Sequence, residues 1–462
     1  MTARTRQHFV VLFVVLALVA AACSDDGGTE TGTGETTTTT TTTTTAAPGD
    51  DPPEPPEEVA PFDSYRGVTA DTITVGVLTT DLDELRELGL VDINQGDREL
   101  IWQTMIDDVN ADGGIAGRQV EMVYREYNPV FTASADDACI ELTQDNEVFI
   151  VLGGVAGPAI DSILCFVEQQ EHMVIGGTHT PAHYPKATMP WVSTVMSSPR
   201  RHQGTLALYQ ELGLLDGRVA TYDDSSEHET VTEDVVLPAL SELGIDVVQS
   251  FTSNVPQGDE VALAEQASVY AEVIDDENID TLIIIQSGIA FGIAHMRENG
   301  FTGTILAIDT GTQVNTIGGL DERPPSLYDG AYAPMGASRD ESWELDASQA
   351  CYDLLRNNAG IDVLHPDEVP EGDPDWVAGA TAPCQYLSVL KAAGDFAGGD
   401  LNPTTFRAGL DQIGKIELAN VVFASISAGK YDADNSLRIG QFDFTSGEIG
   451  KLEPVTDVDS VD

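Results

Sequence analysis

A glycine-rich loop at residues 153–158 is the first segment whose residue types could do chemistry. Its sequence, "GGVAGP", follows the apolar run "VFIVLGG" and precedes a stretch that we expect to be helical. Loops in that position lie at the carboxyl end of a parallel sheet, where open α/β folds bind ligands, and amides at a helix start suit a carboxylate. The loop lacks the GxGxxG dinucleotide pattern and the lysine of a P-loop. It predicts a site for a small polar molecule, and a turn that only packs is the alternative.

A second glycine-rich turn, "GGIAGR" at residues 113–118, has its neighbours in the opposite order. A helical pattern precedes it, and the alternating run "RQVEMVY" follows it. Gly113 or Gly114 can end the helix in a left-handed conformation, and Gly117 eases the turn into the strand. The turn is therefore predicted to be a structural corner at the opposite end of the sheet, without a ligand.

Other residues that could hold a metal or catalyse a reaction form weaker patterns. Five histidines gather in one third of the chain, but Pro181 interrupts the helical spacing of His179 and His183, so we interpret all five as ordinary loop histidines: His172, His179, His183, His202 and His228. The run "DADNS" at 432–436 lacks the glycine and glutamate of a calcium loop and is interpreted as a polar hairpin turn. The GxSxG, HExxH and Walker motifs are absent from the sequence. We expect no cofactor, no metal and no enzymatic activity.

Strand-like and helix-like runs alternate from residue 71 onward, and the rhythm restarts near residue 218. In the first half we expect strands at "TITVGVLTT", "RQVEMVY", "VFIVLGG" and "HMVIGG", with helices at 97–110, 136–145 and 160–170. In the second half we expect strands at "RVATYDD", "IDVVQSF", "IDTLIIIQSG" and "GTILAID", separated by further helices, with later helices at 347–357 and 378–396. This alternation predicts an α/β protein with two doubly wound, Rossmann-like lobes.

The composition sets the class and the location of the protein. The chain has 462 residues and a net charge of −56, from 77 acidic and 21 basic residues, which argues against binding to nucleic acid. Residues 1–22 have the basic start and apolar core of a signal peptide. They end in "VAAAC", which resembles the lipobox of bacterial lipoproteins, so Cys23 is the expected lipidation site; a plain secretory signal is the alternative. Residues 23–66 are rich in Thr, Pro and acids, and we expect a disordered tether.

Four further cysteines are predicted to form disulfides, because an even number in an exported chain favours pairing. Sequence proximity favours Cys139–Cys165 and Cys351–Cys384, and the two other connectivities remain open.

The motifs "NADGGIAGRQVEMVYREYNP", "DNEVFIVLGG", "MVIGG" and "RVATYDD" together resemble the type I periplasmic substrate-binding proteins of ABC transporters. The resemblance is strongest to the branched-chain amino acid (leucine/isoleucine/valine) receptors, in their lipoprotein form, and covers about residues 71 to 455. It implies two lobes joined by a three-crossover hinge, near 196–200, 334–338 and 424–430. The first lobe would comprise residues 67–197 and 336–425, and the second 198–335 and 426–456.

The resemblance also implies which residues contact the ligand. In the first lobe these are the strand-end residue Thr79, the loop residues Gly154, Val155, Ala156 and Gly157, and the hydroxyls of Thr178 and Thr180. In the second lobe they are His228, Ser287, Asp309 and Thr310. His228 stands where relatives carry an aromatic residue that covers the ligand, which argues against leucine or valine. An acid near Asp309 would pair with an amino group.

We therefore expect an extracellular, lipid-anchored, monomeric receptor that delivers a small polar molecule, such as an amino acid, amide or related organic acid, to an ABC permease. A surface sensor of the same fold is the first alternative, and an extracellular hydrolase is the second.

Overall fold

The first sheet consists of five short apolar strands that are all parallel. The computed structural model describes residues 59–225, 228–255, 259–285, 292–308, 325–443 and 452–461. Within them the strand order is β2-β1-β3-β4-β5. The strands are β1 (Thr72–Thr80), β2 (Gln119–Tyr127), β3 (Ile150–Gly153), β4 (Met173–Ile175) and β5 (Trp191–Val192).

The second sheet repeats that order and then adds antiparallel strands. Its strand order is β14-β13-β10-β9-β8-β6-β7. The five strands β7, β6, β8, β9 and β10 are parallel neighbours, as in the first sheet. β13 runs antiparallel to β10 and also pairs with β14 and β15. The strands are β6 (Val219–Asp224), β7 (Val247–Ser253), β8 (Thr281–Ile284), β9 (Thr304–Ala307), β10 (Tyr332–Met335), β13 (Ser436–Phe442), β14 (Leu452–Pro454) and β15 (Asp459–Ser460). Two doubly wound α/β units are therefore confirmed.

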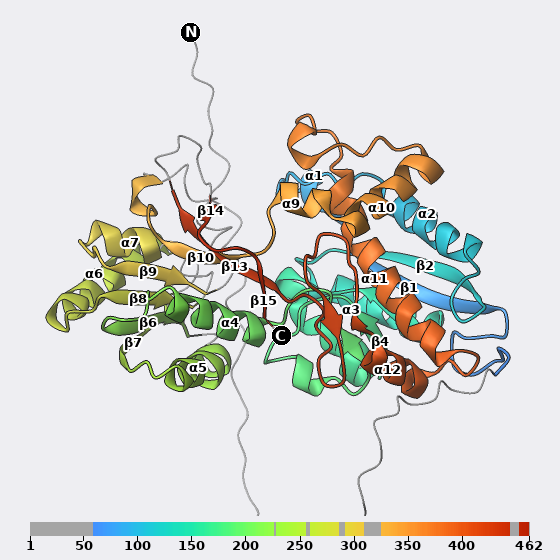
Figure 1. Ribbon diagram of the computed structural model, residues 1–462, viewed down its shortest axis with the longest axis horizontal. Helices are drawn as coiled ribbons and strands as arrows, with labels where there is room; N and C mark the ends of the chain where they lie inside the picture. The colour runs from blue at the N-terminus through green and yellow to red at the C-terminus, as the bar shows by residue number, and fades with distance from the viewer. Residues whose placement is uncertain are drawn as a thin grey trace, which may run out of the picture. The chain divides into compact units, whose positions relative to one another are not determined.

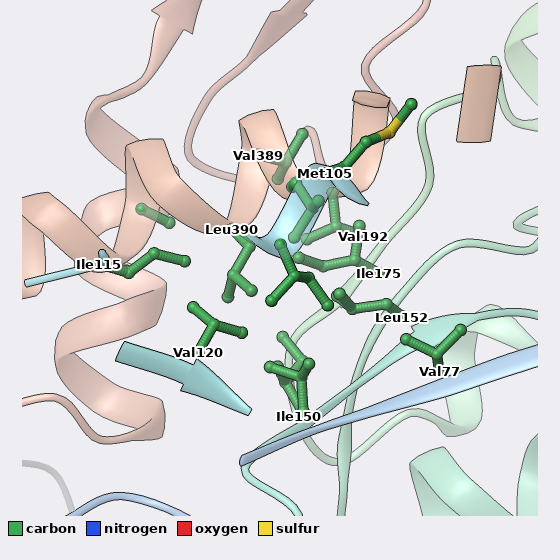
Figure 2. Packing of buried hydrophobic residues seen from close by; sticks show 14 of the residues in the cluster. Val77, Met105, Ile115, Val120, Ile150, Leu152, Ile175, Val192, Val389 and Leu390 are labelled. Atoms are coloured by element: carbon green, nitrogen blue, oxygen red, sulfur yellow. The ribbon is translucent and has the colours of Figure 1, made fainter. Parts of the chain in front are cut away.

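Helices cover both faces of each sheet. They are needed on both faces because successive side chains of a parallel strand point to opposite faces and both sets are buried. On the first sheet, Val77 and Leu152 face one core cluster while Leu78 and Val151 face another. Figure 2 shows Val77, Ile150 and Leu152 of the sheet together with Val389 and Leu390 of the long helix α11. The α-helices around the first sheet are α1 (Leu82–Glu87), α2 (Arg98–Ala111), α3 (Thr132–Ile140), α9 (Arg339–Glu344), α10 (Asp346–Leu354), α11 (Trp376–Ala397) and α12 (Pro403–Gln412).

The α-helices around the second sheet bury two further apolar clusters. They are α4 (Ser198–Glu211), α5 (Leu237–Glu242), α6 (Glu260–Asp276) and α7 (Gly292–Glu298). Short 3-10 or π-helical segments interrupt the regular pattern at η1 (Glu141–Asp145), η2 (Gly157–Ser162), η3 (Cys165–Gln169), η4 (Tyr184–Lys186), η5 (His228–Val236), η7 (Pro325–Leu327), η8 (Leu355–Ala359) and η9 (Pro366–Glu368). None of the helices in the described ranges is long and apolar enough to cross a membrane.

The chain passes between the two sheets at three crossovers. The first lies between Val192 and Ser198, the second between Met335 and Arg339, and the third between Ile426 and Ser436. The helices between the last two crossovers return to the first sheet, so α10 and α11 lie beside α2 although they come much later in the sequence (Figure 1). A small two-stranded sheet, β11 (Gly414–Lys415) with β12 (Ser425–Ile426), precedes the third crossover.

The run "DADNS" belongs to the third crossover, so its interpretation as a polar hairpin turn was wrong. Asp432 is only 3% exposed and accepts a hydrogen bond at 2.8 Å from the amide of Ser197, in the first crossover. It also forms an ion pair at 2.8 Å with Arg200. Burial opposes its ionisation, but the Ser197 amide and the Arg200 charge together hold the pKa of Asp432 below its usual value. Asp432 thus ties two of the three crossovers together.

Four of the five histidines predicted to be loop residues are buried: His172, His179, His183 and His202. His202 lies on helix α4, which the sequence pattern did not predict. Burial lowers the pKa of His172 to about 3 and that of His202 to about 3, so both are neutral in the folded protein. His172, His179 and His183 lie outside the helices and strands, so the prediction of loop positions is confirmed for these three. It is wrong for His202 on α4 and for His228, the first residue of η5.

Both favoured disulfides are confirmed: Cys139 is bonded to Cys165, and Cys351 is bonded to Cys384. The first joins α3 to η3, and the second joins α10 to α11.

The "GGIAGR" turn is a packed corner. Gly114 has φ of +76°, and a Cβ there would lie 1.8 Å from the carbonyl oxygen of Arg118, so only glycine fits. Ile115 is fully buried beside α11, close to Leu390 (Figure 2). The fully buried Arg118 guanidinium donates hydrogen bonds to the carbonyl oxygens of Thr69, Ala116, Gly398, Phe62 and Gly399. Burial lowers the pKa of Arg118 from its usual value, but arginine keeps its charge at neutral pH.

Candidate functional site

The loops after β3 and β4 meet at the carboxyl edge of the first sheet. A Cβ on Gly154 would lie 2.4 Å from the Cα of Gly177, and one on Gly176 would lie 2.6 Å from the carbonyl oxygen of Gly153. The two loops can approach this closely only because both are built from glycine. The two loops that carry the predicted site residues Gly154 to Gly157, Thr178 and Thr180 therefore meet at one edge.

A tyrosine hydroxyl fixes each loop. The Tyr127 hydroxyl, at the end of β2, donates to the carbonyl oxygen of Gly154 at 3.2 Å and accepts from the amide of Ala156 at 2.9 Å. The Tyr386 hydroxyl, on α11, is hydrogen-bonded to the backbone of Gly177 and to Thr194. Burial raises the pKa of Tyr127 and raises that of Tyr386 to about 12, so both hydroxyls stay protonated. The two loops are held in place before any ligand arrives.

We had expected the loop at 153–157 to lead into an α-helix, and it does not. It leads into the six-residue 3-10 helix η2 and then the π-helical segment η3. The amide of Ala156 is bonded to Tyr127, and that of Ala159 donates to the carbonyl oxygen of Pro129 at 3.0 Å. The dipole of a long helix therefore adds nothing to carboxylate binding here.

The Thr180 hydroxyl is oriented by a histidine and an aspartate. Its Oγ1 lies 2.7 Å from Nδ1 of His183, and Nε2 of His183 lies 2.8 Å from Oδ1 of Asp161. In the neutral tautomer that donates from Nε2 to the carboxylate, Nδ1 accepts the Thr180 proton. The oxygen of Thr180 is then left as an acceptor, suited to an ammonium, amide or hydroxyl donor on a ligand.

At the end of β1, the Thr79 hydroxyl is also oriented by a hydrogen bond to another side chain. The Tyr124 hydroxyl donates to Oε1 of Glu126 at 2.9 Å, so it accepts its bond of 2.9 Å from Thr79 Oγ1. Burial raises the pKa of Tyr124 well above its usual range, which keeps this donor protonated. Thr79 thus presents another hydroxyl oxygen with its own proton already used.

On the second sheet, His228 follows β6 and lies between carboxylates. Its Nδ1 is 2.6 Å from Oδ2 of Asp223, and its Nε2 is 3.2 Å from Oε1 of Glu233. The hydrogen bond to Asp223 is the main reason why the pKa of His228 is raised. Because both ring nitrogens have carboxylate partners, a ligand would meet the ring face of His228.

Four other predicted site residues, Ser287, Asp309, Thr310 and Cys23, lie outside the described residues.

Within the described ranges, one group of His and Asp side chains has the spacing of a metal site: Asp340, His365 and Asp367. The amide of Asp367 donates to Nδ1 of His365 at 3.2 Å, so the ring proton is on Nε2, which lies 3.1 Å from Oδ1 of Asp340. A metal on Nε2 would move the ring proton to Nδ1, where it would face the Asp367 amide, and Arg339 already pairs with Asp367 at 3.3 Å. This group is a cluster of hydrogen bonds with one ion pair, near the start of α9.

Sequence reasoning missed Tyr127, Tyr386 and the pair of His183 and Asp161. Only Tyr127 carried a usable signal, because it lies three residues beyond the predicted strand "RQVEMVY", which pairs with β1, and so had to lie near the carboxyl edge. Tyr386 reaches the site from a helix that is distant in sequence, which no local pattern reveals.

Comparison with known proteins gives a family and a fold. A family model described as periplasmic binding protein matches residues 72–443. No curated protein matches this chain in sequence. Similar structures include a fatty acid ABC transporter substrate-binding protein from Thermomonospora curvata, which is 16% identical, has a TM-score of 0.53, and covers 86% of this chain and 95% of its own.

Two further structures extend the likeness. A leucine binding protein from Thermotoga maritima is 16% identical with a TM-score of 0.53, over 84% of this chain and 98% of its own. An ABC transporter solute binding protein from R. palustris, in complex with 4-hydroxybenzoate, is 15% identical with a TM-score of 0.55, over 84% of this chain and 96% of its own. At these identities the likeness establishes the shared fold.

Proposed function

We propose that this chain, which belongs to the periplasmic binding protein family, captures a small polar solute and delivers it to an ABC importer. The observation that carries the proposal is the pair of glycine loops at the carboxyl edge of the first sheet, each fixed by a tyrosine hydroxyl. A site that is rigid before the ligand binds loses little conformational freedom on binding, which favours affinity.

The mechanism is binding without bond cleavage. We assign residues 67–197 and 336–425 to one lobe and 198–335 and 426–456 to the other, with the solute held by both. Because the solute makes contacts with both lobes only when they are closed, it shifts the hinge toward the closed form. The permease would then recognise that form.

The first-lobe hydroxyls favour a solute that donates hydrogen bonds. Thr79 uses its own proton toward Tyr124, and Thr180 does so toward the His183 tautomer that donates to Asp161, so their oxygens are left to accept. An ammonium or amide group fits these acceptors, while a carboxylate needs amides of the glycine loops. An amino acid, an amide or a related organic acid remains the proposed class.

The location follows from the N-terminal sequence. We propose that residues 1–22 are removed on export, that Cys23 is lipidated, and that the acidic tether to residue 66 holds a monomeric receptor at the outer face of the cell membrane. Mass spectrometry of the membrane fraction should find diacylglycerol on Cys23, and Cys23→Ala should release the protein into the medium.

Solute screening tests the function. We expect at least one compound from a panel of amino acids, amides, 4-hydroxybenzoate and fatty acids to raise the melting temperature, with a Kd measurable by calorimetry. Thr180→Val should then weaken binding of that compound about 10-fold or more, since a hydrogen bond to a charged donor contributes about 1.5–3 kcal/mol. Thr188→Val is the matched control, because its hydroxyl bonds to the carbonyl oxygen of Val167. A panel without any binder, or turnover of esters or peptides, would overturn the proposal.

A further inference from the structure

The segment η5 begins with a histidine that lies between two carboxylates. It follows β6 at the carboxyl edge of the second sheet. His228 Nδ1 is 2.6 Å from Oδ2 of Asp223, and His228 Nε2 is 3.2 Å from Oε1 of Glu233. We propose that His228 is a proton-operated latch: it holds the start of η5 against β6 while both ring nitrogens carry protons, and it releases Glu233 when one proton leaves.

The two contacts need a proton on each ring nitrogen. An ionised carboxylate only accepts hydrogen bonds, and a neutral imidazole has one donor nitrogen and one acceptor nitrogen. Both contacts are therefore satisfied only in the imidazolium form. When one proton leaves, the other stays on Nδ1, because Asp223 is fully buried and needs its partner, whereas Glu233 is 58% exposed and can turn to water. The lone pair of Nε2 then repels the Glu233 carboxylate.

The groups around the ring favour the imidazolium form. The hydrogen bond to Asp223 is the main cause of the raised pKa of His228; burial opposes it, and the charges of Asp223 and Glu233 add to it. From β7, the Thr252 hydroxyl lies 3.3 Å from Nδ1. From α6, Tyr270 donates to the carbonyl oxygen of Thr252 at 2.8 Å, and burial raises the pKa of Tyr270, so it stays neutral. The other acids of η5 are exposed: Glu229 and Asp234.

The spacing of His228 and Glu233 matches the unusual form of η5. This segment is π-helical, so its backbone hydrogen bonds join residues five positions apart, and His228 and Glu233 have that separation. In an α-helix, two such side chains would point about 140° apart, because each residue turns the helix by about 100°. The contact therefore favours the π form. Val231 and Val235 of η5 are buried, so the latch controls the first turn while the rest of the segment stays packed.

The latch is closed at low pH and open at high pH. The pKa of His228 in the folded protein is raised above about 6.5, its value in the unfolded chain. Its contribution is therefore complete below pH 6.5 and is lost as the pH rises through the folded pKa. Because η5 begins at the edge where a solute would bind, the latch would make solute affinity depend on pH, a consequence that rests on the proposed function.

Hydrogen exchange of the full chain without solute tests the latch. We expect the amides from Val231 to Val236 to exchange about two- to fivefold faster at pH 9 than at pH 6 after correction for the intrinsic rate, the effect of one exposed ion pair. Glu233→Gln should exchange at pH 6 as fast as the unmodified protein does at pH 9. Glu229→Gln, which changes an exposed acid of the same segment, is the matched control and should keep the difference.

NMR titration of the His228 ring is a second measurement on the unmodified protein. The pKa should lie above 6.5 and should fall in Glu233→Gln. Exchange that does not change with pH, an unchanged difference in Glu233→Gln, or a His228 pKa at or below 6.5 would each overturn the latch.

The effect on solute binding is measured separately. A solute found by the screen should bind about two- to fivefold more tightly at pH 6 than at pH 9, and Glu233→Gln should lose this difference. Equal affinities of the unmodified protein at the two pH values would overturn the regulation of the site. Because hydrogen exchange and NMR need no solute, the latch and the proposed function can fail independently.

Discussion

The first sheet has two glycine-rich corners that look alike in sequence and differ in their place on the sheet and in their exposure. The corner at 113–118 enters β2, and the loop at 153–157 leaves β3; because these strands are parallel, the corners lie at opposite ends of the sheet. In the first corner, Ile115 and Arg118 are fully buried, whereas Ala156 and Gly157 of the second remain exposed. Glycine content therefore says little about function, while the position of a loop relative to strand direction says much.

The largest expected effect is on the first corner. Arg118→Met removes the donors for five carbonyl oxygens, and we expect a loss of about 3–5 kcal/mol in the free energy of unfolding. Urea denaturation measures it. Arg125→Met, which removes an exposed arginine paired with Glu141, should lose about 1 kcal/mol or less. Weaker solute binding by folded Arg118→Met protein would break the contrast between the corners.

Gly114→Ala should come next, with a loss of about 2–4 kcal/mol, because the new Cβ would strike the carbonyl oxygen of Arg118 at a positive φ. Thermal unfolding with and without solute separates stability from affinity. Gly113→Ala, at a neighbouring positive φ but with open space around the Cβ, should lose less. Solute affinity should be unchanged in both variants, and any change would place this corner in the binding site.

Tyr127→Phe tests the second corner, the loop at 153–157. It removes the hydroxyl that holds Gly154 and Ala156, and we expect a loss of about 1–2 kcal/mol in stability together with weaker solute binding. Tyr209→Phe is the matched control, because its buried hydroxyl donates to the carbonyl oxygen of Ala307. The control should lose similar stability and keep its affinity. Equal affinities in the two variants would contradict the role of Tyr127.

The smallest effect is a difference in pH dependence. His179, on the loop beside the second corner, has a folded pKa of about 4 and an unfolded pKa of about 6.5. Its neutral form contributes stability above pH 6.5, and this contribution is lost as pH falls toward 4, because the unfolded state binds the proton first. His179→Phe should therefore reduce the loss of stability between pH 7 and pH 6 by about 0.7 kcal/mol in calorimetry. Arg118 does not titrate there, so the effect of Arg118→Met should be the same at both pH values.

Local patterns predicted the parts of the fold that depend on local sequence. β1 has its predicted bounds, and α2 begins after Asp97, whose carboxylate accepts from the amide of Leu100. Helix α12 was missed even though Asn402 and Thr405 form a capping box. Helix α4 was missed because Pro199, Arg200 and Arg201 weaken the apolar pattern at its start.

The sequence predicted where the candidate site lies better than it predicted which side chains build it. Strand direction located the glycine loops, and the structure brings them together. The burial of His179, the orientation of Thr180 by His183 and Asp161, and the two tyrosine hydroxyls depend on tertiary packing, which periodicity cannot show. The same holds for Asp432, whose partners come from the other end of the sequence.

The return of the chain to the first sheet has a consequence for folding kinetics. Arg118 binds the carbonyl oxygen of Gly399 across 281 positions, and Ser64 binds that of Leu401 across 337. The apolar cluster on this face runs from Val68 to Ala433. Such contacts give a high contact order, which slows folding. The N-terminal strands therefore cannot complete their core as they emerge, and this half of the protein folds only once nearly the whole chain is available.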